Sequence, residues 1–188
     1  MIKIGITGSL ASGKTTASKF LSSKRGPLFS ADDVVKKLYK DKNFKRLISK
    51  KFKIKKNNKI KSALKKLILN NRFHLKKLEQ IIHPLVRKKM KRFTVQNKNK
   101  KLLFYEIPLL IESKLTKFFD IIIFIKCNKR IRFKRFRLKG GDKKIFSFLS
   151  KKQISDHKKT KLCHHVVVNE KKINILKKKL LSIISKYE

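Results

Sequence analysis

The chain has 188 residues and a formal net charge of +43, because 54 Lys and Arg residues stand against 11 Asp and Glu residues. Hydrophobic residues make up 40% of the chain and include 14 Phe, which excludes wholesale disorder and predicts one domain with its own core. Two cysteines exclude a disulfide framework, and no apolar run reaches the roughly 20 residues that cross a bilayer. We therefore expect a cytoplasmic protein with no membrane partner.

The positive charge allows two interpretations. A basic surface can bind nucleic acid, because binding to the phosphates releases counterions. Proteins that read nucleic acids commonly use the guanidinium fork, yet only nine of the 54 basic residues are Arg, and the lysines are spread over most of the chain. We therefore favour a surface that reflects composition and expect no specific nucleic-acid partner. A basic nucleic-acid-binding protein stays as the lesser alternative.

Short apolar segments alternate with helical patterns along the chain. Five segments have the composition of buried strands, namely 2–7, 27–30, 102–105, 120–125 and 166–168. Apolar residues at helical spacing predict further helices at 14–22, 31–39, 130–138 and 173–187. The residue pattern from 43 to about 97 is helical, which predicts a helical insertion. The alternation is typical of an α/β protein whose parallel sheet has right-handed crossovers.

The segment between the first strand and the first helix carries the strongest motif. Residues 8–15 read GSLASGKT, which fits the pattern GxxxxGK[ST] of a phosphate-binding loop (P-loop). Glycines let backbone N–H groups turn toward a phosphate, and the helix that follows contributes the positive end of its dipole. Lys14 would neutralise the β- and γ-phosphates, and the Thr15 hydroxyl would bind Mg²⁺. The nucleotide-binding residues predicted from this motif are Gly8, Ser9, Leu10, Ala11, Ser12, Gly13, Lys14, Thr15 and Thr16.

The remaining motifs favour a small-molecule kinase over a GTPase. Asn128 and Lys129 begin an NKxD guanine motif, but its Asp is missing and no DxxG follows the third strand. A kinase needs a carboxylate near the acceptor hydroxyl. Asp32 and Asp33 directly follow the second strand, at the carboxyl edge of the sheet where ligands of α/β proteins bind. At this point another P-loop nucleoside or nucleotide kinase remains open.

Several segments resemble the dephospho-coenzyme A kinase family, and the resemblance extends over nearly the whole chain. The P-loop is joined by SADDVV at 30–35, LEQIIHPLV at 78–86 and EIPLLIE at 106–112. A terminal pattern of Gln153 and Lys159 is followed by CHHVVVN at 163–169. The LEQIIHPLV segment is more specific to this family than any P-loop.

This chain departs from the family's pattern at five positions. Ser30, Glu106 and His164 stand where the family has Asp. In the lid segment, Lys139 and Gly140 replace an Arg and an Asp, and Lys lacks the bidentate fork of Arg. The P-loop, Asp32 and the His-Pro segment keep the family's residues, so we expect the same reaction.

The resemblance implies transfer of the ATP γ-phosphoryl group to the ribose 3′-hydroxyl of dephospho-coenzyme A, the last step of coenzyme A biosynthesis. Asp32 would orient the hydroxyl and accept its proton, with Lys14 and Arg135 completing the catalytic set. A helix would place Arg132, Arg135 and Lys139 along one face, as a lid over the phosphates.

Further contacts are implied by the resemblance. His83, Pro108 and Lys61 would bind the substrate, and Asn169 would line the adenine side of the ATP site. Glu106, at the end of the third strand, could hold Mg²⁺ through water. We expect Pro84 to occupy the first position of a helix, with His83 just before it.

These inferences give a P-loop kinase-type parallel sheet flanked by helices in a single kinase domain, residues 1–188. Its nucleotide-binding core would comprise 1–31, 100–128 and 160–188, with a helical substrate-binding subdomain at 32–99 and a basic lid at 129–159. We expect a monomer whose partners are ATP, Mg²⁺ and dephospho-coenzyme A.

Overall fold

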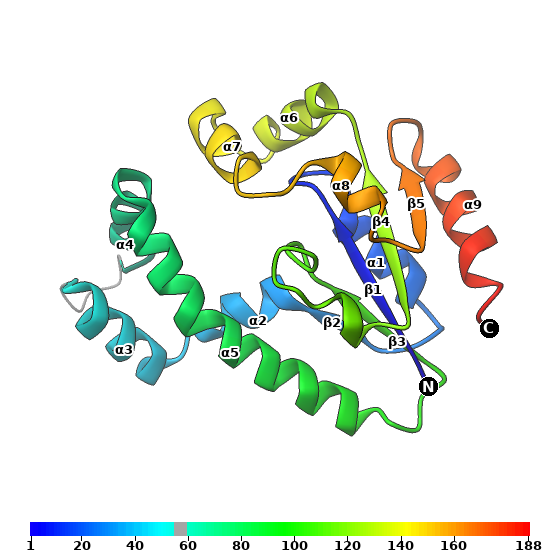
Figure 1. Cartoon of the computed structure of the whole chain (residues 1–188), viewed down its shortest axis with the longest axis horizontal. Helices are drawn as coiled ribbons and strands as arrows, with labels where there is room; N and C mark the ends of the chain where they lie inside the picture. The colour runs from blue at the N-terminus through cyan, green and yellow to red at the C-terminus, as the bar shows by residue number, and fades with distance from the viewer. Residues whose placement is uncertain (55–59) are drawn as a thin grey trace. The chain divides into compact units, whose positions relative to one another are not determined.

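The computed structural model describes residues 1–54 and 60–188, and these form two compact units. Unit 1 comprises Met1–Ser30 and Asn97–Glu188, and unit 2 comprises Ala31–Gln96. Unit 1 contains a sheet whose five strands all pair in parallel, so the predicted α/β class is confirmed (Figure 1). In chain order, the strands are β1 (Ile2–Gly8), β2 (Leu28–Ser30), β3 (Leu102–Glu106), β4 (Ile121–Lys126) and β5 (His165–Val168). Their order across the sheet is β2-β3-β1-β4-β5.

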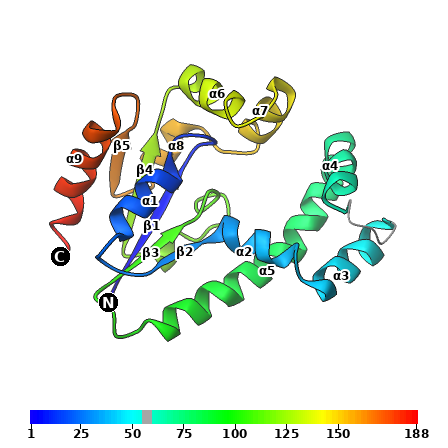
Figure 2. The same cartoon turned by 180° about the vertical axis from the view of Figure 1, so that it is seen from behind.

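Two helices cover one face of this sheet. They are α1 (Lys14–Ser22) and α9 (Ile173–Ile184), which pack against each other and against the strands (Figure 2). Ile4 and Ile6 of β1 point into this layer together with Leu21 of α1 and Leu180 of α9, and all four are fully buried. The alternating apolar side chains of β1 and the apolar stripe of α9 thus pack into a single core.

The connection after β3 packs against the opposite face. A Cβ placed on Gly5 would lie 2.7 Å from Leu110 Cδ1 and 2.9 Å from Phe119 Cγ, so a side chain there would push this connection off the sheet. Tyr105 on β3 forms an edge-to-face contact with Phe119, with ring centroids 5.3 Å apart. Because both faces are covered, the central strands are apolar at nearly every position.

The parallel register places the functional segments at one edge of the sheet. Ser30 at the end of β2 and Ile6 of β1 both pair with Glu106, the last residue of β3. The P-loop starts where β1 ends, at Gly8. The P-loop and Glu106 therefore come together at the carboxyl edge, where ligands of α/β sheets bind.

The segment between β4 and β5 contains three short helices of unit 1. They are α6 (Lys129–Arg137), α7 (Lys143–Ser150) and α8 (Asp156–Thr160). A 3₁₀ turn, η1 (Thr116–Phe118), precedes β4. Within the described residues, none of the helices has the length and apolar character needed to cross a membrane.

Unit 2 consists of helices with a core of their own. They are α2 (Ala31–Leu38), α3 (Lys42–Phe52), α4 (Ile60–Asn70) and α5 (Arg72–Gln96). The core contains Phe44 and Ile48 of α3, Leu64 of α4, and Leu78 and Ile82 of α5.

The prediction that Pro84 starts a helix is wrong. Pro84 lies inside α5, which runs from Arg72 to Gln96. Proline removes one backbone hydrogen bond from a helix interior, which is usually costly. Here Ile82 and Met90 on either side of Pro84 are buried while Pro84 itself is exposed, so packing of the continuous apolar face outweighs the lost bond.

Candidate active site

The P-loop adopts the conformation that its motif predicts. Gly13 caps α1 with φ 95° and ψ 20°, and Ala11 also has a positive φ of 59°. Left-handed residues in such a loop turn consecutive N–H groups toward one point, which forms an anion-binding concavity. Lys14 is the first residue of α1, and its Nζ donates to Ser9 O at 3.0 Å across the loop. The loop therefore holds its own lysine folded over it.

Thr15 and Glu106, the two predicted metal residues, are in direct contact. The Thr15 hydroxyl donates to Glu106 Oε1 at 2.5 Å, and the Ser18 hydroxyl donates to Oε2 at 3.1 Å. Glu106 is only 3% exposed, and the two hydroxyl groups satisfy its buried carboxylate. Hydroxyl and carboxylate oxygens are the ligands that Mg²⁺ prefers, so this pair fits the predicted ion. Thr16, the next residue of α1, is exposed.

Asn169 and Arg135 meet the P-loop at its C-terminal end. Asn169, which follows β5, is buried and donates through Nδ2 to Ser12 O at 2.8 Å. Arg135 Nη1 donates to Asn169 O at 3.1 Å and to Ser12 O at 3.5 Å. The structure thus brings to the P-loop two predicted site residues that lie 123 and 157 residues from Ser12 along the chain.

Two of the three predicted lid residues lie on one helix and contact the same residue, Cys127, whereas the third does not lie on that helix. Arg132 is buried and donates through Nε to Cys127 O at 3.0 Å, and Arg135 Nη1 lies 3.5 Å from Cys127 Sγ. Burial raises the pKa of the Cys127 thiol, although the charge of Arg135 opposes the shift. Helix α6 ends at Arg137, so Lys139 lies beyond it and is exposed. The expectation that a helix aligns Lys139 with the two arginines is therefore wrong, because α6 ends two residues before Lys139 and the left-handed backbone of Gly140, with φ 79°, keeps the helix from continuing.

The predicted substrate residues fall in both units. Pro108 belongs to unit 1, where its carbonyl accepts a hydrogen bond from Thr7 Oγ1 at 3.2 Å. In unit 2, Asp32 is exposed in the first turn of α2, where a carboxylate interacts favourably with the helix dipole. His83 is half-buried within α5, and Lys61 is exposed on α4 with its Nζ 5.0 Å from the centre of the Tyr39 ring.

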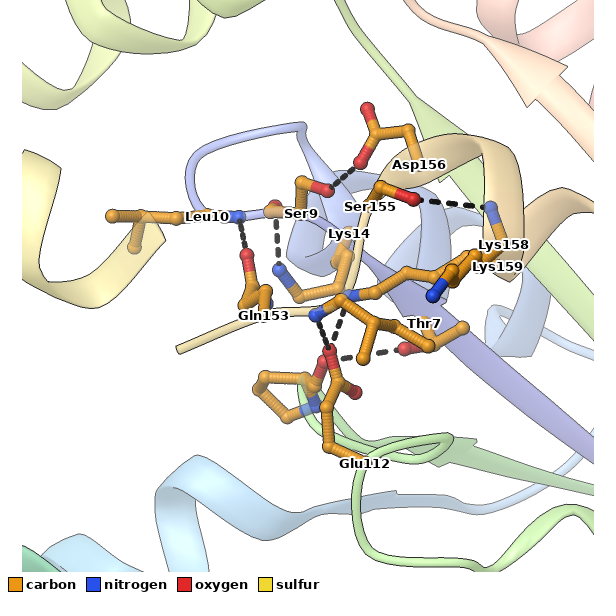
Figure 3. A network of polar contacts seen from close by, with 12 residues as sticks. Thr7, Ser9, Leu10, Lys14, Glu112, Gln153, Ser155, Asp156, Lys158 and Lys159 are labelled. Atoms are coloured by element: carbon orange, nitrogen blue, oxygen red, sulfur yellow. Dashed lines mark hydrogen bonds and ion pairs between the residues drawn. The ribbon is translucent and has the colours of Figure 1, made fainter. Parts of the chain in front are cut away.

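A polar network beside the P-loop was not predicted. Gln153 Oε1 accepts the Leu10 N–H at 2.8 Å, and Asp156 accepts a hydrogen bond from the Ser9 hydroxyl (Figure 3). Both acceptors come from the segment between α7 and β5. The terminal pattern of the sequence included Gln153 but assigned it no contact, and nothing singled out Asp156. A cavity of about 390 Å³ is lined in part by Ser9, Arg132, Gln153 and Asp156.

Comparisons with known proteins agree with this arrangement. A family described as dephospho-CoA kinase matches residues 2–174. A dephospho-CoA kinase from Bartonella quintana is 37% identical over 186 residues, covering 96% of this chain and 95% of its own. A crystal structure from Thermus thermophilus shares the fold with TM-score 0.84 and 24% identity, covering 100% of this chain and 98% of that one. Dephospho-CoA kinase from Campylobacter jejuni shares it with TM-score 0.66 and 21% identity, covering 99% and 97%.

Proposed function

The chain belongs to the dephospho-CoA kinase family, and we propose that it transfers the γ-phosphoryl group of ATP to the ribose 3′-hydroxyl of dephospho-CoA. This reaction would give CoA and ADP. The observation that carries the proposal is the P-loop whose Thr15 hydroxyl donates to the buried carboxylate of Glu106 at one end of the sheet, in a chain matched by the family over most of its length. In phosphoryl transfer a protein mainly positions the reacting groups and stabilises the charge of the transition state, and this loop would perform both tasks.

The nucleotide would bind along the P-loop. Lys14 would neutralise the β- and γ-phosphates, which the start of α1 and the loop's remaining backbone amides would surround, since the Leu10 N–H donates to Gln153 Oε1 and the Ser12 N–H to Ser9 O. Arg135 contacts the last part of the loop through Ser12 O, so its guanidinium would add positive charge at the same end. We place Asn169 on the nucleotide side for the same reason, because it is bonded to Ser12 O.

Thr15 and Glu106 would hold Mg²⁺, the Thr15 hydroxyl directly and Glu106 through water. When bound, the ion would neutralise charge on the β- and γ-phosphate oxygens. The Ser18 hydroxyl keeps the Glu106 carboxylate oriented toward Thr15. A Glu reaches one methylene further than the Asp of the family's pattern, and here that length is used to reach two hydroxyl groups of α1.

Asp32 would act as the general base on the acceptor hydroxyl. It stands two residues after the end of β2, and its carboxylate is exposed. A base of this kind must reach the proton that it abstracts, so an exposed side chain that directly follows a strand of the sheet in sequence suits the role. We assign substrate contacts to His83, Lys61 and Pro108, lid roles to Arg132, Arg135 and Lys139, and the substrate-binding role to unit 2. We further propose that the enzyme is a cytoplasmic monomer.

The deciding experiment is an assay of acceptor choice. The purified protein is incubated with ATP, Mg²⁺ and dephospho-CoA, or with adenosine, uridine or thymidylate as control acceptors, and products are identified by mass spectrometry. The expected result is CoA from dephospho-CoA, its loss on chelation of Mg²⁺, and no product from the controls. Product from a control acceptor without any CoA would overturn the proposal.

A further inference from the structure

One segment of unit 1 connects the P-loop to the turn after β3, and the proposed catalytic roles leave it unexplained. It comprises residues 153–159, most of which form α8, and we call it the clamp segment. Figure 3 shows it with Ser9 and Leu10 of the loop on one side and Glu112 on the other.

Lys159 anchors the clamp segment through a buried ion pair. Its side chain has no exposed surface, and its Nζ lies 2.8 Å from Oε1 of Glu112, whose side chain is 13% exposed. Within the described residues this ammonium makes no hydrogen bond, so the ion pair is what balances its buried charge. Removing two charges from water costs about as much as their attraction returns, so an apolar pair would stabilise the fold equally well. What the ion pair adds is one defined position of α8 relative to the turn.

Glu112 also holds the other end of the clamp segment. Its Oε1 accepts a hydrogen bond from the backbone N–H of Ile154 at 3.2 Å and also forms the ion pair with the Lys159 ammonium. A single carboxylate therefore fixes the segment at positions 154 and 159. The same turn is tied to the end of β1, because Pro108 O accepts from Thr7 Oγ1 at 3.2 Å.

The clamp segment in turn fixes the first half of the P-loop. Gln153 Oε1 accepts a hydrogen bond from the Leu10 N–H at 2.8 Å, and Asp156 accepts one from the Ser9 hydroxyl. Ala11, the next residue of the loop, has a left-handed backbone, which is unfavourable for a residue with a Cβ and needs support from its surroundings. Contacts on Ser9 and Leu10 supply that support from outside the loop.

We propose that Gln153 and Lys159 are positioning residues for phosphoryl transfer, which keep the P-loop in the geometry that aligns the phosphates for reaction. Lys159 is fully buried, so it acts through Glu112 and the clamp segment without touching a substrate. The inference rests on the proposed function. Displacing a reacting group by about 1 Å can lower the rate about 100-fold, so contacts from outside the loop that prevent such a displacement would preserve the rate.

Two variants test the two ends of the clamp segment. Gln153→Met removes the acceptor for Leu10 N–H at similar side-chain length. The double substitution Lys159→Met with Glu112→Gln removes both buried charges, yet an amide oxygen remains for Ile154 N–H, so folding is preserved where Lys159→Met alone would leave a buried carboxylate unpaired. The matched controls are Lys158→Met, which makes the same lysine-to-methionine substitution at the exposed neighbouring residue, and Gln96→Met at the exposed end of α5.

The expected results separate positioning from stability. We expect kcat to fall about fivefold for Gln153→Met, the worth of one hydrogen bond, and about 100-fold for the double variant. The KM for dephospho-CoA should stay unchanged, because the clamp segment contacts the P-loop, where the phosphates of ATP would bind. A role in stability alone would lower the melting temperature but leave the kcat of the folded protein intact. Folded variants with the kcat of Lys158→Met would therefore overturn the inference.

A binding measurement distinguishes failure of this inference from failure of the proposed function. If the unaltered protein makes no CoA, the proposed function fails, and the clamp is judged by ADP affinity measured by calorimetry. A clamp that holds the loop predicts about fivefold weaker ADP binding for Gln153→Met and no change for Lys158→Met. Equal ADP affinity in both variants would refute the clamp in that case.

Discussion

Replacing Gly13 by alanine would test how closely the P-loop fits Asn169. The backbone of Gly13 is left-handed, with φ 95°, which costs about 1–2 kcal/mol for alanine. The new Cβ would lie 2.2 Å from Asn169 Nδ2, so Asn169 must move. That side chain is buried and donates to Ser12 O, and losing the bond adds about 0.5–1.5 kcal/mol. We therefore expect Gly13→Ala to lower the free energy of unfolding by about 2–3 kcal/mol.

Gly140 provides the matched control for this experiment. It is also left-handed, with φ 79°, but a Cβ on it would meet no atom of the described chain within 4 Å. Gly140→Ala should therefore cost only the backbone share, about 1–2 kcal/mol. Urea unfolding of both variants and the unaltered protein gives the comparison. Gly13→Ala should also weaken ADP binding about tenfold, because it displaces the loop's contact with Asn169. Equal destabilisation by the two substitutions, with unchanged ADP affinity, would refute the reasoning.

Further predictions concern the catalytic groups and one thiol. Asp32→Asn should lower kcat at least about 100-fold, the usual worth of a general base, while ADP affinity by calorimetry stays the same; full activity would contradict the assignment. Glu106→Gln should raise the Mg²⁺ concentration needed for half-maximal rate in a magnesium titration, and an unchanged titration would exclude Glu106 from the ion's site. Arg135→Met should weaken both ADP binding and turnover, which the Arg135→Lys variant would restore only in part, because a single ammonium cannot reproduce the guanidinium contacts with Ser12 O and Asn169 O. Burial raises the pKa of Cys163 to about 11 from 9.0, so the folded chain keeps a proton that the unfolded chain loses. The free energy of unfolding should consequently decline between about pH 9 and pH 11, and the decline should be smaller in Cys163→Ala; equal declines would contradict this.

The local structure around the P-loop could be predicted closely from the sequence. The helix at 14–22 has the predicted bounds, and β1 ends one residue later than predicted, at Gly8. The motif is local, since the glycines and the apolar strand before them define both ends of the turn. Local rules failed at Pro84, where burial along α5 decides the structure and the preference of proline for a helix start does not.

The polar contacts that support the loop could not be predicted in the same way. Leu10 and Gln153 are 143 residues apart, and Ser9 and Asp156 are 147 apart. Such contacts depend on the strand order, which places β4 beside β1 and so brings the segment after β4 to the loop. Periodicity and motif spacing carry no information on strand order. The residue types did not indicate these contacts either, because the need of Lys159 for an acidic partner follows from its burial, which only the structure shows.

The few acidic residues of this chain explain more of its function than the many basic ones. Eleven acids cannot neutralise 54 cations, and an exposed ion pair contributes only about 0–1 kcal/mol. A carboxylate that accepts from a helix N-terminus contributes about 1 kcal/mol, and Asp41 and Asp142 do this for α3 and α7. Glu106 and Asp156 instead accept from hydroxyl groups of the P-loop and α1. The positive surface can attract polyanionic substrates of many kinds, whereas carboxylates at these positions shape the one loop that must hold a triphosphate.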